Sequence, residues 1–258
     1  MFRPRLIPVL LLKNKGLVKS VKFKNHNYIG DPINAVKMFN DFNADEIVFL
    51  DISATKEKRT IPIDFVKNVG EEANMPFGVG GGISSLKDIE KIIKSGSEKV
   101  IISSKAIDSP EFIKSASENF GSSTICVCVD IKKNIFGNWK VYYKNGKKSS
   151  SFSPIDLVKI IEDNGAGEII IQSINHDGLM NGYDLNLLNS ISKTVSIPVV
   201  ALGGAGSLDD CVECYKNSYV SALAAGSIFV YQGSRKGVLI NYPSNKEKSS
   251  LLNINKNI

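Results

Sequence analysis

The sequence predicts one α/β domain, a (β/α)8 barrel with a parallel eight-stranded core built from two similar half-barrels. The first observation is an internal repeat: GVGGGISSLKD at 78–88 returns as ALGGAGSLDD at 201–210, and a constant shift of 122 residues aligns more than thirty positions. The second is that each predicted helix lies between two short apolar strands, which is typical of parallel β-α-β units. The third is a length of 258 residues with 43% apolar content, which suits one large core. We therefore expect a single domain over 1–258, half-barrel repeats over 1–120 and 121–242, and a polar C-terminal tail over 243–258.

The first half contains four predicted strands and four predicted helices. Apolar patterning places the strands at 5–12, 46–51, 77–79 and 99–103, and the helices from 32, at 63–73, at 86–95 and from about 110. Asp31 and Pro32 are typical of a helix cap and a first helical turn. The polar segment 13–31 is long for a compact barrel, so we expect it to be a functional or mobile loop.

The second half repeats this order with one insertion. Its strands are predicted at 124–130, 168–172, 199–202 and 222–225, with helices from about 154, 185 and 208. The insertion 134–151 contains an aromatic run and an Asn145-Gly146 pair, which together predict a small hairpin on the rim of the barrel.

Composition argues against several classes of protein. The formal net charge is +6, but the lysines are scattered and have no interleaved aromatic pattern, so we expect no nucleic-acid partner. The apolar run 6–12 is too short to span a membrane and no cleavage site follows it, so we expect a cytoplasmic protein with no membrane partner. Cys211 and Cys214 form a C-x-x-C pair without a second pair, and we expect buried reduced thiols, no metal and no cofactor.

The repeated glycine pairs predict two phosphate sites. In such barrels the chemistry is at the carboxyl ends of the strands, where each pair precedes a helix whose first turn offers unpaired N–H groups. Two such sites across one mouth suit a ligand with phosphate at both ends, although tight turns alone would also explain the glycines. The candidate residues are Gly81, Gly82, Ser103 and Ser104 in one half and Gly203, Gly204, Ala225, Gly226 and Ser227 in the other.

Four charged residues begin strands at the opposite end of the barrel. They are Arg5, Glu46, Lys99 and Glu168. If they point inward, they form a closed ring of two cations and two anions, because buried charges require such pairing. Above this ring, side-chain alternation predicts an apolar bore that could pass a small neutral molecule. The alternative is four solvated strand starts.

The two halves differ at the carboxylates of strands 1 and 5. Asp130 ends the strand at 124–130, whereas the matching position of the first strand is Leu11. A symmetric barrel would place two carboxylates across the mouth for general acid and base catalysis. This chain retains one of them.

Over nearly its whole length the chain resembles the cyclase subunit of imidazole glycerol phosphate synthase. The resemblance is carried by the segments 49–52, 76–83, 127–130, 165–169, 177–178, 182–184 and 203–206. It implies a glutaminase subunit docked at the N-terminal face, and ammonia that passes a salt-bridge gate at Arg5, Glu46, Lys99 and Glu168 to reach a bisphosphate ribonucleotide. Two catalytic aspartates are also implied, of which Asp130 matches one and Leu11 replaces the other.

The resemblance also implies ligand contacts from other rim loops. Lys19 matches a family lysine that helps to close over substrate, and Asp51, Asp177 and Gly178 are further candidate binding residues. Without a second aspartate we expect cyclase activity to fall on the order of 10²-fold or more.

Three functions follow as hypotheses. The loss at Leu11, with the segments 175–180 and 238–243, resembles a paralogous branch associated with surface-polysaccharide genes, in which the subunit supplies ammonia to a separate sugar amidotransferase. The second hypothesis is an authentic cyclase of histidine biosynthesis, with Asp51 or Asp177 replacing the missing acid. The third is a non-catalytic scaffold that only activates the glutaminase.

Overall fold

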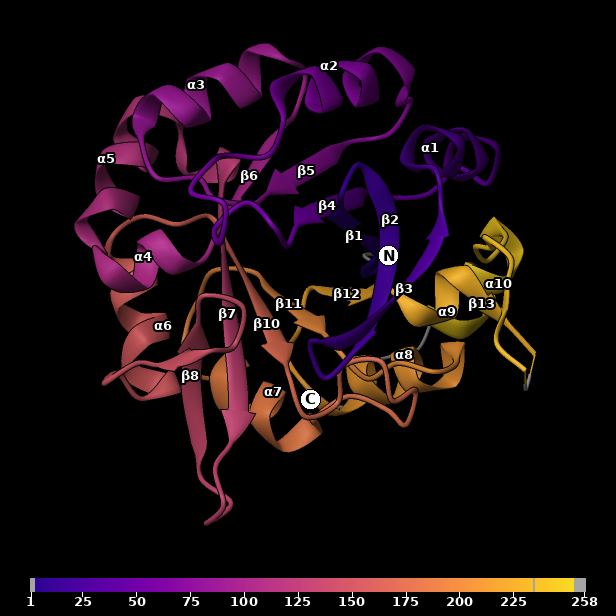
Figure 1. Ribbon diagram of the computed structural model, residues 1–258. Helices are drawn as coiled ribbons and strands as arrows, with labels where there is room; N and C mark the ends of the chain where they lie inside the picture. Colours follow the sequence, from indigo (N-terminus) through magenta and orange to yellow (C-terminus); the bar gives the residue numbers. More distant parts are fainter. Residues whose placement is uncertain (1–2, 234, 253–258) are drawn as a thin grey trace.

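Eight parallel strands close into a barrel in the structure, a computed structural model that describes residues 3–233 and 235–252 (Figure 1). The strands neighbour one another in the order β1, β4, β5, β6, β7, β10, β11 and β12, and β12 pairs back onto β1. The predicted fold class is therefore confirmed. The bounds are β1 (Arg5–Lys13), β4 (Ile47–Asp51), β5 (Phe77–Gly80), β6 (Lys99–Ile102), β7 (Ile125–Lys133), β10 (Glu168–Ser173), β11 (Val199–Leu202) and β12 (Ala222–Ala225).

Helices surround the barrel and bury their apolar faces on its outer surface. The longer ones are α1 (Pro32–Asp41), α2 (Ile63–Glu72), α3 (Leu86–Lys94), α5 (Glu111–Phe120), α6 (Pro154–Asp163), α7 (Leu185–Ser192) and α8 (Leu208–Asn217). Shorter turns are α4 (Ser104–Asp108), a 3-10 helix (Ser122–Thr124) and α9 (Ser227–Val230). A second apolar cluster, smaller than the outer one, fills the inside of the barrel.

Helix starts follow the local chemistry of the sequence. The Asp31 carboxylate accepts a hydrogen bond from the backbone N–H of Asn34, and Pro32 occupies the first turn of α1 as expected. Helices α3 and α8 both begin with capping boxes, Ser85 with Asp88 and Ser207 with Asp210. Ser85 and Ser207 are 122 residues apart, the same shift as the sequence repeat. These caps fix the loops at the carboxyl ends of β5 and β11.

The segment 13–31 is a β-hairpin rather than the expected loop. Its strands, β2 (Gly16–Val21) and β3 (Lys24–Gly30), continue antiparallel from the end of β1. Leu17, Val18 and Ile29 are buried by this pairing, whereas most of β3 is exposed. Because most residues of β3 are polar and exposed, the sequence of this segment has no clear alternation of apolar and polar residues that would predict a strand.

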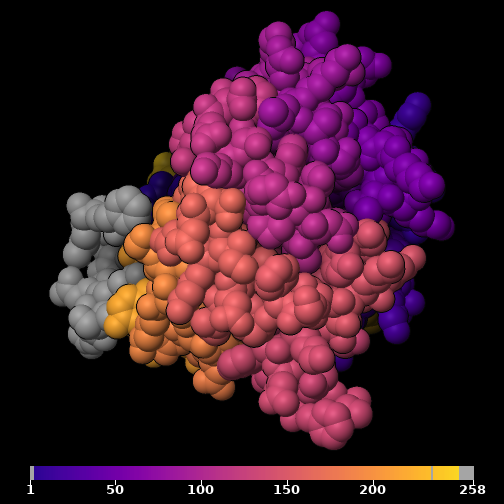
Figure 2. Space-filling view, turned by 90° about the vertical axis from the view of Figure 1, so that its left-hand side faces the viewer, coloured from indigo at the N-terminus to yellow at the C-terminus, as the bar shows by residue number. Residues whose placement is uncertain are grey.

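The insertion on the rim forms the predicted hairpin. Strand β7 extends past Asp130 and pairs antiparallel with β8 (Trp139–Tyr143), which pairs in turn with β9 (Lys148–Ser149). Asn145 and Gly146, both with positive φ, form the connection between β8 and β9. The β7–β8 end projects from the body of the molecule (Figure 2).

The C-terminal segment, expected to be a polar tail, has defined structure where it is described. A short ladder of β13 (Tyr231–Gln232) and β14 (Gly237–Val238) is followed by helix α10 (Asn245–Leu252). Lys248 in this helix is 1% exposed, so the segment packs against the barrel despite its polar composition. Residues 253–258 lie outside the described part of the chain.

Candidate functional site

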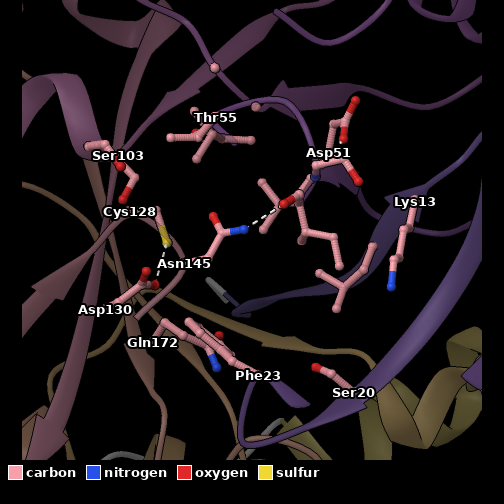
Figure 3. A pocket seen from close by; sticks show the side chains of 18 of the residues that line it. Lys13, Ser20, Phe23, Asp51, Thr55, Ser103, Cys128, Asp130, Asn145 and Gln172 are labelled. Carbon is pink, nitrogen blue, oxygen red and sulfur yellow. Dashed lines mark hydrogen bonds between the residues drawn. The ribbon is translucent and has the colours of Figure 1, made fainter. Parts of the chain in front are cut away.

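A cavity of about 970 Å³ opens at the carboxyl ends of the barrel strands (Figure 3). We call it the ligand cavity. Every ligand-binding or catalytic position predicted from the sequence lines it, although these positions come from eight different strand ends and loops. They are Leu11, Lys19, Asp51, Gly81, Gly82, Ser103, Ser104, Asp130, Asp177, Gly178, Gly203, Gly204, Ala225, Gly226 and Ser227.

Asp130 is the carboxylate with acid–base properties suited to catalysis. Burial, together with the negative charge of Asp177, raises its pKa to about 7, against the opposing effect of a weak hydrogen bond from Cys128 Sγ at 3.9 Å. A carboxyl group with a pKa near 7 can accept or donate a proton at neutral pH. Leu11 also lines the ligand cavity, with a side chain that cannot transfer a proton.

Asp51 is committed to the loop that follows β4. Its Oδ1 accepts hydrogen bonds from the backbone N–H groups of Ser53 (2.9 Å) and Ala54 (3.2 Å), and its Oδ2 pairs with Arg59 Nη1 at 2.5 Å. Both carboxylate oxygens are therefore occupied. This argues against Asp51 as the replacement for the missing acid.

Asp177 fastens the β2–β3 hairpin over the ligand cavity. Its Oδ2 accepts from Ser20 Oγ at 3.0 Å and from the backbone N–H of Phe23 at 3.2 Å. The Phe23 ring lies against Gly146, where an added Cβ would be 3.1 Å from the ring. The β2–β3 hairpin and the Asn145-Gly146 turn therefore meet above the cavity, and Asn145 donates to the Ile52 carbonyl at 2.5 Å (Figure 3).

Lys19 is a buried cation on the same hairpin. It is 6% exposed, so it is not a solvated surface lysine. Burial lowers its pKa, and attraction to Asp177 opposes this effect. A Cβ at position 226 would lie 1.8 Å from Lys19 Nζ, so Gly226 leaves the space that the ammonium group occupies. Lys19 thereby lies next to one predicted phosphate site.

The two glycine pairs lie on opposite sides of the barrel mouth. One follows β5 and the other follows β11, and four positions separate these strands in the eight-stranded barrel. Backbone packing also requires glycine here: a Cβ on Gly82 would be 1.8 Å from the Arg59 carbonyl oxygen, and one on Gly204 would be 2.0 Å from that of Gly182. The glycines therefore serve tight loop packing, and their N–H-rich turns face the ligand cavity as well.

The four charged strand starts form a closed ring at the other end of the barrel. Arg5 pairs with Glu46 and Glu168, while Lys99 pairs with Glu46 at 3.0 Å and with Glu168 at 2.8 Å. Burial alone lowers the pKa of Lys99, but attraction to Glu168 and Glu46 outweighs it and the pKa is raised. We call this set the charged ring.

An apolar bore, lined by the inward side chains of the strands, lies between the charged ring and the ligand cavity. A space of about 10 Å³, close to that of one water-sized molecule, lies directly above the ring. Val9 and Ile101 line both this space and the ligand cavity. Cys126 and Cys128 also face the bore, and burial raises the pKa of both thiols, so they are neutral. The remaining lining residues are Ile7, Val48, Ile170, Val200 and Ala224.

Gln172 is a site residue that the sequence interpretation missed. It is 5% exposed, lines the ligand cavity, and lies opposite Asp130 in the β7–β10 register. Strand alternation from Glu168 through Ile170 would have pointed Gln172 into the barrel. Phe23 and Asn145 were missed because hairpin contacts, rather than strand ends, bring them to the cavity.

Fold and site together define a (β/α)8 barrel protein with a large ligand cavity at one end and an ion-paired ring at the other. Within the described residues, no group of three or more His, Cys, Asp or Glu side chains could hold a metal ion. No helix in 3–233 or 235–252 is long and apolar enough to cross a membrane. All four cysteines are buried, in agreement with the expected thiols.

The chain belongs to the family of histidine biosynthesis proteins, whose family model matches residues 5–236. A protein of Leptospira interrogans, provisionally named imidazole glycerol phosphate synthase subunit HisF, is 43% identical over 97% of this chain and 99% of its own length. A Vibrio vulnificus protein with the provisional name of subunit hisF3 is 43% identical over 98% of both chains. The imidazole glycerol phosphate synthase subunit HisF of Flavobacterium psychrophilum is 42% identical over 91% of this chain and 93% of its own. The resemblance to this synthase subunit is therefore confirmed at the level of the family.

Proposed function

We propose that this chain is the cyclase-like synthase subunit of a glutamine-dependent amidotransferase complex. A partner glutaminase docks at the N-terminal face of the barrel and releases ammonia. The ammonia passes the charged ring and the bore to the ligand cavity. The nitrogen serves the amidation of a bacterial surface sugar, through a separate sugar amidotransferase.

The observation that carries this proposal is the contrast between a complete charged ring below an apolar bore and a reduced catalytic pair. The charged ring and the bore have the charges and the apolar lining that conduction of neutral ammonia requires. At the cavity end, Asp130 faces Leu11 where general acid–base catalysis would use two carboxylates. The numbered names hisF3 and hisF2 of two relatives support a paralogous branch.

Histidine biosynthesis is the second candidate function, and one observation favours it. The pKa of Asp130, about 7, would let this single carboxyl group act as acid in one step and base in another. In that case the chain would convert the bisphosphate ribonucleotide and ammonia to imidazole glycerol phosphate and the aminoimidazole carboxamide ribotide. The named relatives support this function for the family as a whole.

Turnover of the bisphosphate ribonucleotide distinguishes the two functions. The purified chain with its glutaminase should form imidazole glycerol phosphate at a rate on the order of 10²-fold or more below that of typical enzymes of this kind. A Leu11→Asp variant restores the second carboxylate and should raise that rate. The Leu11→Asn variant is the control, because Asn has nearly the size and polarity of Asp but cannot exchange a proton at neutral pH.

Rapid turnover by the unmodified chain would contradict the sugar-amidation proposal, as would growth of a histidine auxotroph that carries only this gene. If such growth depended on Asp130, the chain would be an authentic cyclase. A rate that Leu11→Asp leaves unchanged would argue that position 11 is not what limits the cyclase reaction.

A further inference from the structure

Gln172 presents a hydrogen-bonding group that the rest of the protein leaves unused. Gln172 is 5% exposed, and within the described residues no acceptor pairs with its side-chain Nε2. Two other buried side-chain atoms share this condition, on Arg3 and Asn189, and neither residue lines the ligand cavity. A buried N–H group without an acceptor costs free energy, so its presence beside a cavity points to a ligand that supplies the acceptor.

The position of Gln172 relates it to two parts of the candidate site. Along the sheet it is the register partner of Asp130 on β7 and of Leu202 on β11. Its Nε2 lies beside the turn after β11, since a Cβ on Gly203 would be 2.9 Å from that atom. Gln172 therefore lies between the Gly203-Gly204 turn and Asp130, and Figure 3 shows Gln172 beside Asp130.

The floor of the ligand cavity is polar on one side only. Asp130, Cys128 and Gln172 come from the neighbouring strands β7 and β10. The floor positions on the neighbouring strands β1 and β4 include Val9, Leu11 and Leu50, which offer no hydrogen bond. At this floor a ligand can therefore hydrogen-bond to Gln172 and Asp130 but not to Val9, Leu11 or Leu50.

We propose that Gln172 is a specificity-determining residue that hydrogen-bonds a ligand oxygen located between a phosphate group and the carbon beside Asp130. The ligand class is a sugar phosphate or polyol phosphate with a hydroxyl or carbonyl oxygen near its phosphate. Rotation of the Gln172 carboxamide by half a turn exchanges its N–H donors and its oxygen acceptor with little change in shape. The side chain can therefore donate to a carbonyl oxygen or accept from a hydroxyl group. This inference rests on the proposed function, because it also requires that a ligand binds in the ligand cavity.

Small phosphates of matched size test this assignment without any need for the natural ligand. Glycerol 3-phosphate carries hydroxyl groups next to its phosphate, whereas propyl phosphate has the same carbon chain without them. NMR titration of the full-length chain should show about tenfold tighter binding of glycerol 3-phosphate, the worth of one hydrogen bond. Gln172→Met, which retains the side-chain length and removes the amide, should bind both compounds with the affinity of propyl phosphate.

Asn189→Leu is the matched control, since it removes an amide whose buried oxygen has no hydrogen-bond partner and which lies outside the cavity, and it should retain the tenfold preference. In the unmodified chain, the side-chain amide resonances of Gln172 should shift with glycerol 3-phosphate and much less with propyl phosphate. This measurement does not depend on whether the Met variant folds.

Equal binding of the two compounds by the unmodified chain would overturn the assignment, as would a preference that persists in Gln172→Met. Failure of either compound or inorganic phosphate to bind at all would also overturn it, because no phosphate would then be held beside Gln172. None of these binding measurements involves ammonia, so they do not test the proposed function. Conduction of ammonia through the barrel is tested separately, by comparison of product formation from glutamine with product formation from ammonium salts.

Discussion

At the scale of single residues, Asp130 links the electrostatics of the cavity to the stability of the protein. Its ordinary pKa is 3.8, and burial with the nearby Asp177 raises it to about 7 in the folded chain. Between these pH values the unfolded chain has released a proton that the folded chain retains. This carboxyl group therefore makes the protein progressively less stable as the pH rises from about 4 to about 7.

Asp130→Asn should remove this dependence. We expect the free energy of unfolding of the variant, relative to the unmodified chain, to increase by on the order of 3 kcal/mol between pH 4 and pH 8. Urea unfolding at several pH values measures the difference, and the exposed Asp209→Asn is the control, with no such trend. A difference that is constant over this range would show that Asp130 ionises normally in the folded protein. Any nitrogen transfer in the ligand cavity should fall on the order of 10²-fold in the variant.

The residue scale also shows what could be predicted from the sequence. Asp130 and the glycine pairs were found because a strand end and a repeat are local patterns. The unpaired amide of Gln172 could not be predicted, because it becomes apparent only when the groups packed around Nε2, such as Gly203 thirty-one positions further along the chain, are placed by the fold. Similarly, Lys19 was predicted only through the family resemblance, since its burial depends on the hairpin that folds over the cavity.

At the scale of elements, the largest differences from expectation are in polar segments. The β2–β3 hairpin and helix α10 were expected to be a loop and a tail, because neither has a clear apolar stripe. In α10 the packing residue is Lys248, which pairs with Asp45 at 3.0 Å, donates to the Asn43 carbonyl at 3.3 Å and lies over the Tyr242 ring. A buried ion pair supports this contact, and a hydropathy pattern does not detect ion pairs.

The contact of α10 reaches the strand that carries Arg5. Asp45 Oδ2 accepts from the backbone N–H of Leu6 at 3.0 Å, and the Tyr242 hydroxyl donates to the Leu6 carbonyl at 2.8 Å. Burial by itself raises the pKa of Asp45, but the hydrogen bonds from Leu6 and Lys248 outweigh it and the pKa is lowered. The C-terminal segment therefore holds the start of β1 in place.

Lys248→Ala should destabilise the fold by about 3 kcal/mol, because it leaves the carboxylate of Asp45 buried without one of its cations. The exposed Lys246→Ala in the same helix should change the free energy of unfolding by less than about 0.5 kcal/mol. Urea unfolding of both variants measures the effect. If both substitutions lower the free energy of unfolding by the same amount, the buried Lys248–Asp45 pair contributes no more stability than an exposed charge. Packing of α10 through Lys248 would then not stabilise the barrel.

At the scale of the whole molecule, the two ends of the barrel have different chemistry, and the apolar bore lies between them. The glutamates of the charged ring are almost fully buried, with side-chain exposures of 4% and 8%, while Arg5 and Lys99 are 33% and 20% exposed. The fold class and the ring could be predicted because repeat, strand order and alternation fix both. The cover that the two hairpins form over the ligand cavity could not be predicted, because it depends on contacts between distant parts of the chain.

Lys99→Met tests whether the passage through the barrel is used. The substitution retains much of the side-chain volume but leaves Glu46 and Glu168 to share Arg5, so we expect a disturbed ring and a bore that leaks or blocks ammonia. In the complete complex with its glutaminase, product formation from glutamine should fall about tenfold, while formation from ammonium salts at high pH should fall far less. The exposed Lys91→Met on α3 should affect neither reaction.

An equal loss with both nitrogen sources would locate the defect in the fold or the cavity. No loss with glutamine would mean that ammonia does not cross the ring, and the barrel would then act as a scaffold for the glutaminase.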